Sequence, residues 1–186
     1  MNTRERILQA SAKLFYRDGV RAVSVDAIAE KAGVTKRTLY YHFRSKDDLI
    51  AAYLEERDQP NLALFQRWFA EAEGSLAEKI EAIFRQLARS ARHPKWKGCG
   101  FLRTSVELVE FPGHPAMVAG RIHKKRVEDW LGETLGDPLL ARQIALLMDG
   151  AFATVLLQRD PSYLEAAGQA AARLVGSSQA SARSPT

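Results

Sequence analysis

The 186-residue chain carries a formal net charge of +5, and 46% of its residues are hydrophobic, as is usual for a soluble globular protein. No run approaches the roughly 18 consecutive apolar residues of a membrane span, and the charged N-terminus lacks the apolar segment of a signal peptide. Because there is one cysteine, no intrachain disulfide can form. These features predict a cytoplasmic protein that has no membrane partner.

Positive charge is concentrated at the start of the chain. Residues 1–46 hold 10 Lys and Arg against 4 Asp and Glu, whereas residues 47–186 hold 17 against 18. A basic segment attached to a neutral body is the electrostatic pattern of a protein that binds a polyanion. Basic solvated faces are also common, so charge by itself does no more than favour nucleic acid as a partner.

Capping and turn residues predict an all-α chain of nine to ten helices. Ser24, Thr35 and Ser45 are typical N-caps, Gly19 and Gly33 are typical helix terminators, and proline at position 60 predicts a helix break. In chain order, the predicted helices cover about 4–18, 25–32, 36–42, 46–59, 61–73, 76–91, 101–110, 115–135, 138–158 and 161–175.

The same signals divide the chain into three parts. Residues 1–46 are predicted to form a three-helix head, and residues 47–176 a helical body. Residues 177–186 lack large apolar side chains and are expected to be disordered.

The segment 25–42 predicts a helix-turn-helix. Ala29 is small where two helices must cross closely, and Gly33, four residues later, tolerates the positive φ of a tight turn. Apolar side chains stand where the second helix must be held against the first: Ile28, Ala32, Val34 and Leu39. An ordinary helical hairpin with a glycine turn is the alternative interpretation.

Polar residues around this motif favour DNA as the polyanion. With Leu39 buried, Lys36 and Arg37 project from the first turn of the second helix, the end that approaches base edges, and arginine can pair bidentately with guanine. Ser24 and Lys46 lie at other helix N-termini, where backbone N–H groups favour phosphate. Ser24 can cap its helix and contact phosphate together, so the two roles do not exclude each other.

Two stretches, RERILQASAKLFYRDGV and SVDAIAEKAGVTKRTLYYHFRSKDDLI, resemble the DNA-binding domain of the TetR family of transcriptional regulators. The resemblance implies that residues 36–42 enter the major groove of a double-stranded operator, while Tyr41, His42 and Lys46 grip the backbone. Val25 departs from many members, which carry Thr or Ser there. The predicted DNA-contacting residues are Ser24, Thr35, Lys36, Arg37, Thr38, Tyr40, Tyr41, His42 and Lys46.

The resemblance also implies a homodimeric repressor that a small molecule releases from DNA. The segment 138–158 is apolar around most of its circumference, so it is buried on two sides, either within one chain or against a second copy. The family layout implies the second copy, with 138–158 and the alanine-rich 161–175 forming a four-helix bundle.

A small apolar or aromatic effector is expected to bind in the body, where aromatic side chains are frequent. The predicted effector-contacting residues are Phe65, Trp68, Phe69, Phe84, Cys99, Phe101, Glu107, Met148 and Phe152. Ordinary core packing is the alternative for each of them. Asp149 interrupts an apolar run and must satisfy either a ligand or a backbone group, and Cys99 is either a redox sensor or a small packed residue.

No metal-ligand spacing, nucleotide fingerprint or catalytic motif occurs in the sequence, so we expect no metal, no cofactor and no enzymatic activity. Two other functions remain as alternatives. The first is a constitutive or architectural DNA-binding dimer without a ligand, and the second is a helical-bundle enzyme.

Overall fold

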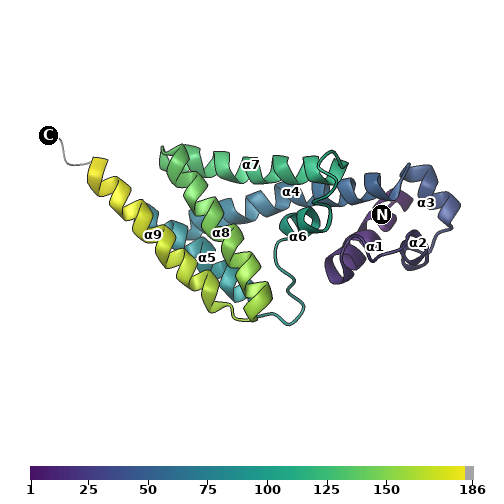
Figure 1. The fold of residues 1–186 in the computed structure, drawn as a ribbon, viewed down its shortest axis with the longest axis horizontal. Coiled ribbons are helices and arrows are strands. Elements are labelled where there is room, and N and C mark those ends of the chain that lie inside the picture. Colours follow the sequence, from purple (N-terminus) through teal and green to yellow (C-terminus); the bar gives the residue numbers. More distant parts are fainter. Residues whose placement is uncertain (183–186) are drawn as a thin grey trace. The chain divides into compact units, whose positions relative to one another are not determined.

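The computed structural model describes residues 1–182, and every regular element in this range is a helix (Figure 1). The predicted all-α fold is therefore confirmed. The helices are α1 (Thr3–Asp18), α2 (Val25–Ala32), α3 (Lys36–His42), α4 (Lys46–Glu71), α5 (Leu76–Ala91), α6 (Gly100–Glu107), α7 (Pro115–Leu135), α8 (Pro138–Gln158) and α9 (Ser162–Ala182).

The chain forms two compact units. Unit 1 comprises Met1–Pro60 and Cys99–His123, and unit 2 comprises Asn61–Gly98 and the described residues from Lys124 onward. Helices α4 and α7 contribute residues to both units. Unit 1 is larger than the predicted 1–46 head because apolar residues of α4 and α6 are buried in the same cluster as those of α1, α2 and α3.

Side-chain caps start most helices where the sequence predicts them. Ser24 and Thr35 accept backbone N–H groups three residues ahead, at 3.1 Å in both cases. Ser75 and Glu78 form a complete capping box at α5, and Asp137 caps α8 directly before Pro138. These local contacts satisfy N–H groups that have no partner within the helix, which fixes the helix starts.

The predicted break at Pro60 is wrong, because α4 continues through this residue to Glu71. An interior proline removes one backbone hydrogen bond and costs about 3 kcal/mol. Apolar residues are buried on both sides of it: Tyr53 and Leu54 before, Leu62 and Phe65 after. Each such burial contributes about 1.5–3 kcal/mol, so together they outweigh the cost of the proline.

The predicted end of the last helix is also wrong. Helix α9 continues past Val175 and Gly176 to Ala182, so residues 177–182 are helical rather than disordered. Val175 is buried, and the hydroxyl of Ser178 lies 3.5 Å from the Asp137 carboxylate, which ties this turn to the start of α8. Residues 183–186, part of the predicted disordered tail, lie outside the described residues.

Unit 2 is organised around α9, which packs against α5 and α8 (Figure 1). The two helices approach closely at Gly168, because a Cβ atom there would lie 2.6 Å from the Cβ of Phe84. Phe84 is fully buried. The absence of a side chain at position 168 therefore sets the spacing of these two helices.

We expect Gly168→Ala to lower the free energy of unfolding by about 1–3 kcal/mol, because the added methyl group overpacks the α5–α9 contact. The control is Gly176→Ala in the same helix, where a Cβ would meet no atom within 4 Å. That change should raise stability by about 0.5–1 kcal/mol through helix propensity. Urea denaturation followed by circular dichroism measures both, and equal effects of the two variants would contradict the close-contact explanation.

Helix α8 is apolar on more than one face. Among the described residues it is the one helix with the length and composition to cross a membrane, with a mean hydropathy of 1.5 over 18 residues. Leu140, Ile144 and Met148 are buried in unit 2, whereas Leu146 and Leu157 are 67% and 80% exposed. The buried stripe makes α8 a core helix of unit 2, and the exposed stripe is left uncovered by the residues that the structure describes.

Candidate nucleic-acid interface and the groove between the last helices

The helix-turn-helix has the predicted geometry. Gly33 ends α2 with φ 64° and ψ 43°, in the left-handed region that favours glycine. Ala29 and Leu39 are buried, at 5% and 0% exposure. The turn is also held by Arg6 of α1, whose guanidinium donates to the carbonyls of Ala32 (2.9 Å) and Gly33 (3.0 Å). The role of Arg6 is not predictable from the sequence, because only the folded chain brings its side chain close to the turn.

Helix α3 presents a polar and aromatic face to solvent. Tyr40 and Tyr41 are 43% and 86% exposed, and Lys36 and Arg37 are also exposed. Lys36 forms an ion pair with Asp26 at 3.1 Å. The Arg37 guanidinium makes no hydrogen bond or ion pair within residues 1–182, so it remains available to an outside acceptor.

The hydroxyl groups at the edges of the motif are already in use as caps. Ser24 caps α2, and Thr35 both caps α3 and lies 2.8 Å from the hydroxyl of Thr38. His42 lies edge-on against Tyr41, with ring centroids 5.2 Å apart. Contacts of these side chains with phosphate stay predictions.

Lys46 lies at the start of α4 and is partly buried. Its ammonium donates to the backbone carbonyl of Arg21 at 3.2 Å. Partial burial lowers the pKa of Lys46, while the carboxylates of Asp47 and Glu107 act to raise it. An ammonium group has three donors, so a phosphate can still be bound beside this internal contact.

The predicted effector residues fall in different units. Cys99, Phe101 and Glu107 belong to unit 1 and the other six to unit 2, so the structure does not gather the nine within either unit. In unit 1, the ring of Phe101 stacks on His123 with centroids 3.6 Å apart. Cys99 is partly exposed, and the Glu107 carboxylate accepts the N–H of Arg21 at 2.9 Å.

Unit 1 contains a buried polar pair that the sequence does not predict. The Nδ1 atom of His123 lies 2.8 Å from a carboxylate oxygen of Asp58, and the two side chains are 3% and 8% exposed. The pair joins α4 to α7 beneath the ring of Phe101. Two polar groups 65 positions apart leave no local pattern in the sequence, so only the fold reveals them.

Unit 2 holds the other aromatic residues of the predicted effector set, and it also contains a partly buried ion pair. Rings pair at 6.2 Å between Trp96 and Phe152, and at 6.0 Å between Phe65 and Trp68. Asp149, which interrupts the apolar run of α8, pairs with the ammonium of Lys124. The protein therefore supplies a partner for this carboxylate without a ligand.

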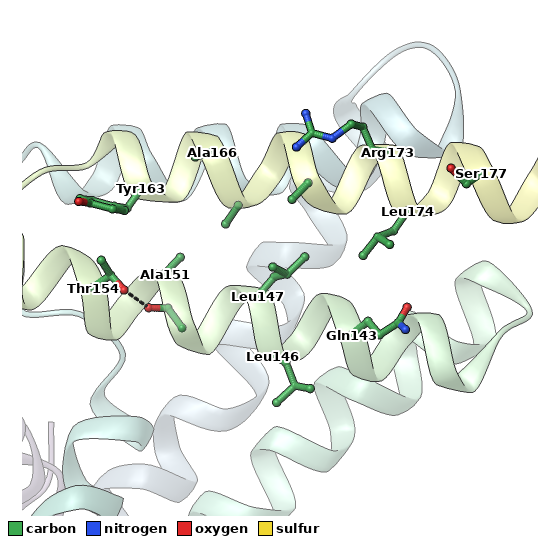
Figure 2. A pocket seen from close by; sticks show the side chains of 13 residues that line it. Gln143, Leu146, Leu147, Ala151, Thr154, Tyr163, Ala166, Arg173, Leu174 and Ser177 are labelled. Atoms are coloured by element: carbon green, nitrogen blue, oxygen red, sulfur yellow. Dashed lines mark hydrogen bonds between the residues drawn. The ribbon is translucent and has the colours of Figure 1, made fainter.

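A wide groove of about 860 Å³ lies between α8 and α9 (Figure 2). Its lining is mainly apolar or small, and Tyr163 and Arg173 lie on the α9 side. The lining residues are Gln143, Leu146, Leu147, Gly150, Ala151, Thr154, Tyr163, Ala166, Ala167, Ala170, Arg173, Leu174 and Ser177. Both helices are those predicted to form a dimer interface. Among residues 1–182, no three His, Cys, Asp or Glu side chains are grouped as metal ligands would be.

A basic helix-turn-helix in an all-helical chain defines a DNA-binding protein, and comparison with known proteins identifies its family. The model for bacterial regulatory proteins of the tetR family matches residues 7–53. A solved TetR-family transcriptional regulator from Streptomyces coelicolor is 30% identical to this chain, with a TM-score of 0.80 and coverage of 93% of each chain. The chain belongs to the TetR family of transcriptional regulators.

Curated relatives match over shorter segments. The HTH-type transcriptional regulator TtgR of Pseudomonas putida is 32% identical over 94 residues, which are 48% of this chain and 45% of TtgR. The HTH-type transcriptional repressor KstR2 of Mycolicibacterium smegmatis is 27% identical over 126 residues, which are 68% of this chain and 52% of KstR2. The chain thus spans about half the length of these relatives.

Proposed function

We propose that this regulator is a cytoplasmic homodimeric repressor that binds a palindromic operator and is released from it by a small apolar or aromatic effector. The observation that carries the proposal is an unpartnered apolar groove between α8 and α9 in a chain with a complete helix-turn-helix. The similarity to a relative named as a repressor supports repression rather than activation of transcription.

The groove between α8 and α9 is suited to a second copy of the chain. Soluble monomers rarely expose large contiguous apolar patches, yet Leu146 is 67% exposed and Leu174 37% exposed on this face. Small residues at Gly150 and Ala170 leave room for a close approach of helices. A two-fold interface uses the same surface on both copies, so the two recognition helices would meet two symmetric half-sites.

DNA contacts are tested on a duplex recovered by selection from a random-sequence library. We expect Arg37→Ala to relax base preference at one position of each half-site, at a cost of about 1–3 kcal/mol, because its free guanidinium is suited to a base edge. Lys46→Ala should weaken all sequences nearly equally and flatten the dependence of affinity on salt. Fluorescence anisotropy at several salt concentrations measures both, and a changed base preference in Lys46→Ala would contradict a backbone contact.

The effector part of the proposal rests on the aromatic content of unit 2, where Trp68, Trp96 and Phe152 each pair with another ring. Tryptophan fluorescence and melting temperature can follow binding in a screen of apolar and aromatic compounds. Any compound that weakens operator binding must itself bind more weakly, by the same factor, when operator is present. Compounds that stabilise the protein but leave operator affinity unchanged would support a constitutive DNA-binding dimer instead.

A further inference from the structure

The backbone of Arg21 is held from both sides by side chains of two other helices. Its N–H donates to the carboxylate of Glu107, the last residue of α6, at 2.9 Å. Its carbonyl accepts from the ammonium of Lys46, the first residue of α4, at 3.2 Å. We call these two contacts the Arg21 clasp. All three residues lie in unit 1.

Helix α6 has a second contact with the same connection. Arg103, one turn before Glu107, donates to the backbone carbonyl of Tyr16 near the end of α1 at 2.8 Å. Its guanidinium also lies 5.9 Å from the centroid of the Tyr16 ring. Helix α6 therefore contacts the chain on both sides of Gly19. Arg103 donates a hydrogen bond to the backbone before this glycine, and Glu107 accepts one from the backbone after it.

The turn at Gly19 is shaped to admit the Glu107 carboxylate. Gly19 has φ +89°, and a Cβ atom there would lie 2.8 Å from one Glu107 oxygen. Both the backbone conformation and the close approach require glycine. The carboxylate is therefore in van der Waals contact with the turn as well as hydrogen-bonded to it, which fixes its position relative to the backbone of Arg21.

The Arg21 clasp lies directly before the DNA-reading motif. Val23, two residues later, is buried in the unit 1 core, and Ser24 is the N-cap of α2. Lys46, the other partner of the clasp, is the predicted phosphate contact. The backbone of Arg21 therefore links Glu107 of α6 to the Lys46 ammonium. The same backbone leads, three residues later, into the N-cap of α2.

We propose that Glu107 is a positioning residue for DNA binding, which acts through the Arg21 clasp by fixing the connection between α1 and α2 and the ammonium of Lys46. This role rests on the proposed phosphate contact of Lys46. It requires a hydrogen-bond acceptor at position 107 and does not require a negative charge. A carboxylate that acted only through its charge would instead weaken DNA binding, because it repels phosphate.

Two substitutions separate these roles. Glu107→Gln keeps a carbonyl oxygen that can accept the Arg21 N–H and removes the charge, whereas Glu107→Ala removes both. The control is Glu110→Ala, which removes the same charge three residues later from an exposed side chain with no partner within the described residues. If the alanine variant does not fold, Glu107→Asp replaces it in the comparison. Aspartate is shorter by one methylene group, so its carboxylate lies farther from the Arg21 N–H.

The four variants are compared on the selected duplex by fluorescence anisotropy, with circular dichroism as the check of folding. We expect Glu107→Ala to bind about tenfold more weakly, and Glu107→Gln and Glu110→Ala to stay within about twofold of the unmodified protein. In a double-mutant cycle with Lys46→Ala, the losses should add only in part, because Glu107 acts partly through the position of the Lys46 ammonium, which the second substitution removes. Glu107→Asp should fall between the alanine and glutamine variants.

Three results would overturn the role of the Arg21 clasp: full affinity in folded Glu107→Ala or Glu107→Asp, an equal loss in Glu107→Gln, or additive losses in the cycle. Failure of the unmodified protein to retain any duplex in the selection is a different result. It would overturn the proposed DNA-binding function, and the role of Glu107 with it.

Discussion

Glutamate in place of Leu146 is expected to give a folded monomer that binds operator at least about 100-fold more weakly than the unmodified protein. Leu146 is 67% exposed and lines the groove between α8 and α9, so a single chain tolerates the charge. In a two-fold interface the substitution occurs twice, and burial of two carboxylates in place of leucine side chains carries a large desolvation cost. A monomer then loses the avidity that two linked recognition helices provide. Size-exclusion chromatography with light scattering and fluorescence anisotropy measure the two effects.

The matched control for this variant is Val109→Glu, which introduces the same charge at a 63% exposed position outside the groove. It should leave both oligomeric state and operator affinity unchanged. A Leu146→Glu protein that stays dimeric would place the interface elsewhere, and a monomer with undiminished operator affinity would rule out the avidity argument.

Removal of the Asp58 carboxylate is expected to lower the free energy of unfolding by about 2–3 kcal/mol, because a buried polar group left without its partner is costly. Asp58→Ala takes the acceptor from Nδ1 of His123, whose side chain is 3% exposed beneath Phe101. The comparison is Asp129→Ala, which breaks the ion pair of Asp129 with Lys125. Asp129 is 54% exposed, so its loss should cost less than about 1 kcal/mol. Urea denaturation of both proteins measures the difference, and similar losses would show that burial of the His123–Asp58 pair contributes little.

Local chemistry made much of the fold predictable from sequence. A cap or a glycine turn acts within four residues, so Ser24, Gly33 and Thr35 mark their helix ends without knowledge of the tertiary structure. The two failures, at Pro60 and at Gly176, have one cause. Both residues weaken a helix locally, and tertiary contacts keep the helix intact in both places: buried side chains on either side of Pro60, and at Gly176 the buried Val175 together with the contact of Ser178 with Asp137.

The local structure of the candidate site was predictable where it consists of one continuous segment. Capping residues and helical spacing within residues 24–46 predict the bounds of α2 and α3, while their contacts with DNA stay predictions. The residues that support this segment come from far along the chain: Glu107 reaches Arg21 across 86 positions, and Arg6 reaches Gly33 across 27. Phe84 and Phe101 are both buried, but aromatic composition carries no information on tertiary contacts and so could not assign these two predicted effector residues to different units.

The hydroxyl caps of the helix-turn-helix restrict how this regulator can evolve a new operator. Ser24 and Thr35 each accept a backbone N–H, so their loss would weaken a helix start whatever DNA sequence the protein meets. The Arg37 side chain, by contrast, caps no helix and has no partner within the described residues. Inherited changes of operator preference should therefore accumulate at Arg37, while Ser24 and Thr35 stay fixed among descendants that read different DNA.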